Sequence, residues 1–157
     1  MDPTQMVPHS FYAMASDLLH LVFAYALALP IGWNREREEH TAGIRTFPIV
    51  AVASCGLALV AGAIPGITAD SYTRLLQGLV TGIGFIGGGA ILRDKGGVTG
   101  TATAASVWNI GIVGAAVGMG GYHIAVALSL VNFLTLRFLK PRRPSSNVQI
   151  NENDSEV

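Results

Sequence analysis

The sequence predicts an all-α protein, a polytopic transmembrane helical bundle with five spans. Half of the 157 residues are apolar and only 13% are charged, whereas soluble domains carry about 25% charged residues. The mean hydropathy is positive, at +0.47. Residues 47–65, 75–92 and 102–119 contain no charged side chain, and each stretch is close to the ~20 residues with which a helix crosses a bilayer.

Two further stretches complete the five spans. Residues 15–33 carry Asp17 and His20 near one end and Pro30 near the other, where a helix terminus or a kink tolerates them. Residues 122–139 are interrupted only by Arg137, which is close enough to the end of the span to reach the lipid headgroups.

A bundle of soluble helices is the alternative, and it requires a polar face on each helix. Residues 49–64 provide no such face. A cleaved signal peptide is not expected, because no Lys or Arg precedes the first apolar stretch. We therefore expect the first span to stay in the mature protein.

The basic residues gather on one side of this five-span arrangement. Arg74 falls on the other side, and the remaining nine lie in the first loop, the third loop and the carboxyl-terminal end: Arg35, Arg37, Arg45, Arg93, Lys95, Arg137, Lys140, Arg142 and Arg143. Because cytoplasmic loops are enriched in Lys and Arg, the amino terminus is predicted outside and the carboxyl terminus in the cytoplasm. Residues 1–14 then form a periplasmic tail, residues 15–140 the transmembrane domain, and the polar residues 141–157 a disordered cytoplasmic tail.

Glycine is concentrated in the third and fourth spans. Fourteen of the nineteen glycines lie between residues 78 and 121, and small-xxx-small spacing lets helix backbones approach closely in lipid. We therefore expect these two spans to form the centre of the bundle. The glycines that we assign to helix packing are Gly78, Gly82, Gly84, Gly87, Gly88, Gly89, Gly114 and Gly118.

No motif in the chain indicates catalysis. Gly82, Gly84 and Gly87 match the GxGxxG pattern of dinucleotide-binding folds, but they lie inside an uncharged span and no carboxylate follows near Val107. Four scattered histidines and the single Cys55 do not have the spacing of metal ligands or of a catalytic triad. We expect no enzyme, cofactor or metal site, and the net charge of zero does not indicate nucleic acid.

Four sequence blocks together resemble the MgtC/SapB family. They are IGWNRE at residues 31–36, AGIRT at 42–46, GIGFIGGGAILR at 82–93 and VTGTATAASVW at 98–108. The resemblance covers most of residues 28–139, with departures at residues 33–34 and 101–102. It implies a bacterial inner-membrane protein, associated in some members with growth at low magnesium, survival inside macrophages and restraint of the ATP synthase. Many relatives carry a soluble carboxyl-terminal domain, and we expect any function of that domain to be absent here.

Two matched blocks flank the first loop and supply candidate functional residues. Glu36 lies directly under the first span, and Arg45 and Thr46 directly precede the second. A desolvated pair between Glu36 and Arg45 has fixed bidentate geometry that could gate or position a partner. The alternative is a solvated surface cluster, in which such a pair contributes ~0–1 kcal/mol.

The third loop supplies two more candidates. Arg93 ends the third span, and a tight turn over residues 93–97 leads to Thr99, Thr101 and Thr103 at the start of the fourth. A helix amino terminus attracts an anion, a lipid phosphate or a partner carboxylate. Helix capping by a threonine is the alternative.

The polar residues inside the spans favour packing over ion transport. Asn109, Gln77 and Asn132 can each form a hydrogen bond between helices, at ~0.6 kcal/mol. No carboxylate lies near the middle of a span, whereas Mg²⁺ prefers carboxylate and water oxygens.

The function expected from the sequence is therefore a non-enzymatic membrane factor. It would contact membrane lipids and other integral membrane proteins, for which the family resemblance implies the ATP synthase as one candidate, and self-association through its glycine faces is a further hypothesis. The rival hypothesis is a transporter or channel for a small ion, in which residues 82–89 form a broken helix along the path.

Overall fold

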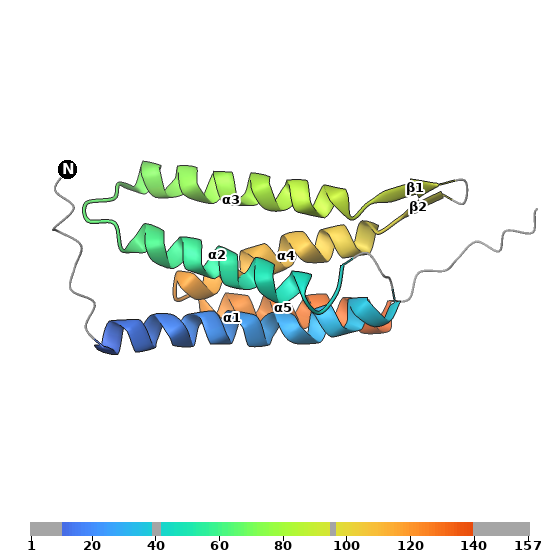
Figure 1. Cartoon of the computed structure of the whole chain (residues 1–157), viewed down its shortest axis with the longest axis horizontal. Helices are drawn as coiled ribbons and strands as arrows, with labels where there is room; N and C mark the ends of the chain where they lie inside the picture. The colour runs from blue at the N-terminus through green and yellow to red at the C-terminus, as the bar shows by residue number, and fades with distance from the viewer. Residues whose placement is uncertain (1–10, 39–41, 95–96, 140–157) are drawn as a thin grey trace, which may run out of the picture.

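The computed structural model describes residues 11–38, 42–94 and 97–139, which form five helices and one hairpin (Figure 1). The elements are α1 (Phe11–Glu38), α2 (Thr46–Gly62), α3 (Ala69–Gly89), β1 (Leu92–Asp94), β2 (Gly97–Thr99), α4 (Thr101–Gly118) and α5 (Tyr122–Phe138). The helical class expected from the sequence is confirmed. The predicted tails lie outside the described residues, except that residues 11–14 belong to α1 and not to a tail.

Helix α4 occupies the centre of the bundle and contacts each of the other four helices. Many of its own side chains are buried, among them Val107, Ile110, Val113 and Val117, as is typical of a helix that is apolar on every side. Helix α3 lies at the edge, against α4 and partly against α2 (Figure 1). The expectation that the third and fourth spans share the centre is therefore wrong for the third span.

Glycines on α4 explain its close packing against α2. A Cβ atom at Gly114 would overlap the carbonyl oxygen of Ala51, and one at Gly118 would lie 2.5 Å from the carbonyl oxygen of Cys55. The two helix backbones therefore approach at a distance that only glycine permits, as small-residue packing in lipid predicts. Helix α3 meets α4 through Ile83, which fills the space over Gly111.

Two of the described helices are long and apolar enough to cross a membrane, namely residues 11–37 of α1 and the whole of α4. Helices α2 and α5 are also apolar but have 17 residues each, about 26 Å at 1.5 Å per residue. Large apolar side chains are exposed on the outside of the bundle, including Leu19, Val60, Phe85 and Val131. An exposed apolar surface of this extent is unusual for a soluble monomer.

The segment between α3 and α4 contains two short strands that the sequence did not predict, on either side of the predicted tight turn, and residues 95–96 of that turn lie outside the described residues. Helix α3 continues without a break to Gly89, and β1 and β2 then pair as the antiparallel strands of the hairpin, with Arg93 opposite Val98. Gly100 follows with a φ of +82°, and a Cβ atom there would overlap the carbonyl oxygen of Ala90. Glycine alone fits both the positive φ and the close approach, so the hairpin returns directly into α4.

Candidate functional site at the arginine-rich end

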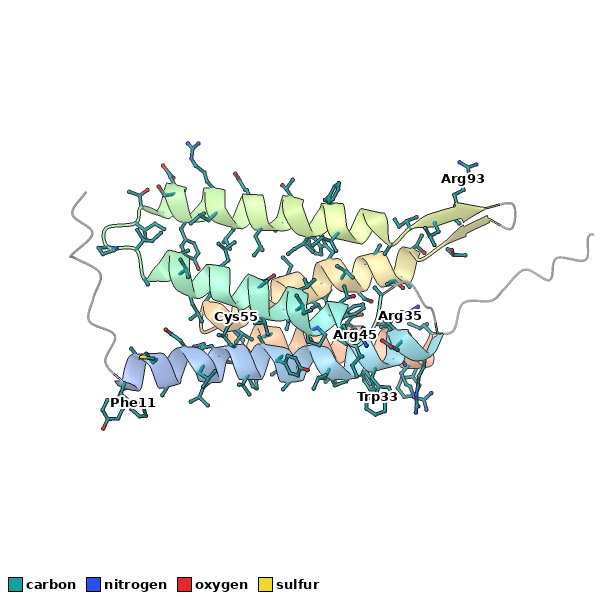
Figure 2. The ribbon with its side chains drawn as sticks, in the orientation of Figure 1. Phe11, Trp33, Arg35, Arg45, Cys55 and Arg93 are labelled. Atoms are coloured by element: carbon teal, nitrogen blue, oxygen red, sulfur yellow. The ribbon has the colours of Figure 1, made fainter. Side chains whose placement is uncertain are left out.

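The helices alternate in direction, and this alternation brings five of the six described arginines to one end of the bundle. The carboxyl ends of α1 and α5, the amino end of α2 and the hairpin meet there (Figure 1). We call this the arginine-rich end; its arginines are Arg35, Arg37, Arg45, Arg93 and Arg137. Figure 2 shows Arg35, Arg45 and Arg93 at this end and Phe11 at the opposite one. Arg74, in the first turns of α3, lies at the opposite end.

The junction between α1 and α2 is held by a carboxylate. Glu36 Oε2 accepts a hydrogen bond from the backbone N–H of Ile44 at 2.7 Å, and the Gly43 carbonyl oxygen accepts one from Thr46 N at 3.0 Å. A Cβ atom at Gly43 would overlap the Glu36 carboxylate. Glu36 therefore orders the turn that opens α2. The pair with Arg45 that the sequence left open is not found, and the Arg45 side chain is exposed, as in the alternative of a solvated cluster.

Arg35 differs from its neighbour Arg37, although the sequence places both in one charged cluster. Arg35 is only 3% exposed, whereas Arg37 is exposed. Residues 24, 28, 31 and 35 share one helical face, and Ala24, Ala28 and Ile31 are fully buried. The sequence indicates this burial through the i, i+4, i+7, i+11 spacing of these four residues. The pattern is recognised only if the first helix extends past residue 33 to include the charged residues.

Arg93 and Thr103 occupy different environments at the arginine-rich end. Arg93 projects from β1 away from the bundle (Figure 2), whereas Thr103 is fully buried in α4. Gly100 is the N-cap of α4 and provides no side-chain cap, so the threonine cap considered above is not found at that position. The structure does not bring Arg93 and Thr103 together.

Polar side chains inside the bundle join helices to one another. Ser106 Oγ donates to Asn132 Oδ1 at 3.0 Å, and Asn109 Nδ2 donates to the Leu128 carbonyl oxygen at 3.2 Å. Both bonds connect α4 to α5, and Ser129 Oγ connects α5 to α1 by donating to the carbonyl oxygen of Leu27 at 2.8 Å. Asn109 thus has an interhelical partner. Within the described ranges, no three His, Cys, Asp or Glu side chains lie close enough to hold a metal ion.

The outward face of α3 carries a stripe of small and polar residues. Gln77, Thr81, Gly84 and Gly88 recur at i, i+4, i+7 and i+11 and are all exposed; we call them the α3 stripe. Of the eight glycines that the sequence assigned to helix packing, Gly87, Gly114 and Gly118 contact another helix. A Cβ atom built on Gly87 would lie 3.1 Å from the carbonyl oxygen of Ala104. The other five have open space where a side chain would project: Gly78, Gly82, Gly84, Gly88 and Gly89.

Comparison with known proteins finds relatives along most of the chain. It is 32% identical over 140 residues to protein SrpB of Synechococcus elongatus, covering 79% of this chain and 77% of the relative. It is 32% identical over 142 residues to protein SapB of Bacillus subtilis, covering 83% of this chain and 59% of the relative. Protein MgtC of Salmonella typhimurium is 33% identical over 114 residues, covering 73% of this chain and 48% of the relative.

The chain thus spans about half to three fifths of the length of MgtC and SapB. No solved structure matches it. The MgtC family matches residues 21–143, a range that includes the whole arginine-rich end and the α3 stripe. The chain therefore belongs to the MgtC family.

Proposed function

We propose that this chain is a multi-pass protein of the bacterial inner membrane that regulates other membrane proteins by direct contact. All five helices span the bilayer, with the arginine-rich end in the cytoplasm, and the protein catalyses no reaction. Its physiological setting is adaptation to low magnesium, and the ATP synthase is one candidate partner. Membership of the MgtC family and relatives that include MgtC itself support this proposal.

The observation that carries the proposal is the α3 stripe. Gln77 and Thr81 are exposed on the same face as Gly84 and Gly88, and Phe85 beside them is 86% exposed. Lipid offers no hydrogen-bond partner to an exposed side-chain amide, while small residues allow another helix to approach closely. A transmembrane helix of a partner, or of a second copy of this chain, satisfies both requirements.

Affinity capture from native membranes tests this proposal. We expect a defined membrane complex to copurify with the wild-type protein and to be lost with Gly84→Leu/Gly88→Leu, because two leucines prevent close approach. Gly78→Leu/Gly82→Leu is the matched control, since these glycines are on the same helix and also meet open space but line the groove toward α2. Equal recovery of the complex with both double variants would contradict the proposal.

Self-association through the same face is tested by crosslinking two differently tagged copies. The Gly84→Leu/Gly88→Leu variant should lose the crosslinked dimer, and the Gly78→Leu/Gly82→Leu variant should retain it. Unchanged crosslinking of the first variant would remove the stripe as a contact between copies.

The ion-transport hypothesis predicts a different result. It required a broken helix at residues 82–89, whereas α3 is continuous as far as Gly89, and Asn109 is bonded to α5. A reproducible ion flux in liposomes that is lost in Thr81→Ala or Asn109→Ala would favour transport over regulation. We expect no such flux.

A further inference from the structure

A groove of about 510 Å³ lies between α1 and α5 at the arginine-rich end; we call it the α1–α5 groove. The residues that matter in its lining are Pro30, Trp33, Asn34, Arg37, Phe133 and Arg137. It is on a different face of the bundle from the α3 stripe, because α3 contributes nothing to its lining.

Helical spacing gives the groove one apolar end and one cationic end. On α1, Pro30 lies seven residues before Arg37, about 10 Å along the axis at 1.5 Å per residue. On α5, Phe133 lies one turn before Arg137. Both helices run toward the arginine-rich end, so the two guanidinium groups share that end. The described lining contains no carboxylate.

Trp33 contacts the guanidinium group of Arg37 and fixes its position. The Arg37 Cζ atom lies 5.5 Å from the centre of the Trp33 ring, within range of a cation–π contact. Trp33 is 55% exposed and projects outward from α1 (Figure 2). Tryptophan is enriched at the headgroup level of a bilayer, and arginine in the loops directly beside it. In the membrane orientation proposed above, this end of the groove therefore lies at the depth of the lipid phosphates.

The groove wall also contains an unused hydrogen-bond acceptor. Asn34 Oδ1 is buried, and no donor to it is found among the described residues. A buried polar atom without a partner costs free energy. A rotation of the Asn34 side chain toward the groove would expose this oxygen to a hydroxyl group, which would provide the missing donor.

We propose that the α1–α5 groove binds one anionic phospholipid with a hydroxylated headgroup, of the phosphatidylglycerol type. Its phosphate sits between Arg37 and Arg137, where charge-assisted hydrogen bonds are available. A headgroup hydroxyl donates to Asn34 Oδ1 once that side chain turns toward the groove, and an acyl chain runs along Pro30 and Phe133. Basic pockets between membrane helices bind anionic headgroups for the same physical reason. The inference rests on the membrane insertion in the proposed function, but not on the regulation of any partner.

Quenching of Trp33 fluorescence by brominated lipids tests this assignment. The chain has two tryptophans, so a Trp108→Phe background isolates Trp33. In phosphatidylcholine vesicles with a small fraction of brominated phosphatidylglycerol, Trp33 should be quenched as if that lipid were enriched about 25-fold, the product of about fivefold for each arginine. The same fraction of brominated phosphatidylcholine should quench only at the level of random mixing.

Substitutions of the two arginines separate the site from general attraction of anionic lipid. Arg37→Gln and Arg137→Gln should each lower the enrichment about fivefold, and the double variant should abolish it. Arg93→Gln is the matched control, because Arg93 is an exposed arginine at the same end but outside the groove. Equal losses in the control and in the groove variants would overturn the assignment.

Two further results would overturn it in distinguishable ways. Equal quenching by the brominated forms of both lipids would remove the lipid site and leave the membrane insertion intact, whereas no quenching by either would remove both. Inorganic phosphate should leave the enrichment unchanged. If millimolar phosphate released the lipid, the groove would be a site for a soluble anion.

Discussion

Glu36 and Ile44 are eight residues apart, and a 2.7 Å hydrogen bond from the Ile44 N–H to the Glu36 carboxylate ties the last turns of α1 to the turn that opens α2. The bond connects two of the sequence blocks that carry the resemblance to the family. It gives Glu36 a role in holding the loop geometry at the arginine-rich end.

Removing this carboxylate should loosen the junction. We expect Glu36→Ala to lower the free energy of unfolding by about 1 kcal/mol, or the melting temperature in detergent by about 3 °C. Glu36→Gln should lose less, because it keeps an acceptor oxygen. Arg93→Ala, an exposed residue at the same end, should leave the melting temperature unchanged. An equal fall for all three variants would exclude a specific role for Glu36.

Two glycines should respond to the same substitution with opposite signs. At Gly114 an added methyl group overlaps the backbone of α2, while at Gly88 it enters open space. Gly114→Ala should destabilise the protein by about 1–3 kcal/mol through overpacking. Gly88→Ala should be neutral or stabilising by up to about 1 kcal/mol, because alanine favours the helix. Thermal unfolding in detergent measures both, and a loss at Gly88 equal to that at Gly114 would contradict the packing described here.

The sequence predicted the positions of the helices better than their arrangement. Apolar stretches of about membrane length located each helix, because apolar length is a local property. The sequence could not place α3 at the edge of the bundle. The small-xxx-small spacing at Gly84 and Gly88 shows that this helix face permits close approach, but it does not show which helix packs against the face. The hairpin was missed because strands of three residues are too short to show an alternating pattern.

The candidate site was predicted only in part. Assigning the basic residues to loops located Arg35, Arg37 and Arg45 at one end of the bundle, because the end at which a loop lies depends only on the directions of the helices that it joins. It could not distinguish the buried Arg35 from the exposed Arg37, because the charged residues were assigned to a loop and not to the last turns of α1. The partner of Glu36 is a backbone N–H, which no pattern of side chains indicates.

The hydrogen bond between Ser106 and Asn132 should show measurable coupling. In a double-mutant cycle of Ser106→Ala and Asn132→Ala, we expect a coupling free energy of about 0.6 kcal/mol and at most about 1.7 kcal/mol, the range for such bonds between membrane helices. Ser106→Ala with Ser129→Ala is the control, since Ser129 bonds to a different helix. That pair should be additive to within about 0.5 kcal/mol. If the control pair shows a coupling free energy as large as that of Ser106 and Asn132, the coupling reflects a general loosening of α5 and not the hydrogen bond between them.

The orientation across the membrane should be visible in the reactivity of single cysteines. The only native cysteine, Cys55, is buried and can be replaced by alanine. In that background, a maleimide that does not cross the inner membrane should label Arg74→Cys in intact cells, because Arg74 lies at the end opposite the other described arginines. Arg93→Cys should react only after permeabilisation, because basic residues are retained on the cytoplasmic side. The reverse pattern would invert the proposed orientation, and labelling of both positions in intact cells would show that the two ends do not lie on opposite sides of a bilayer.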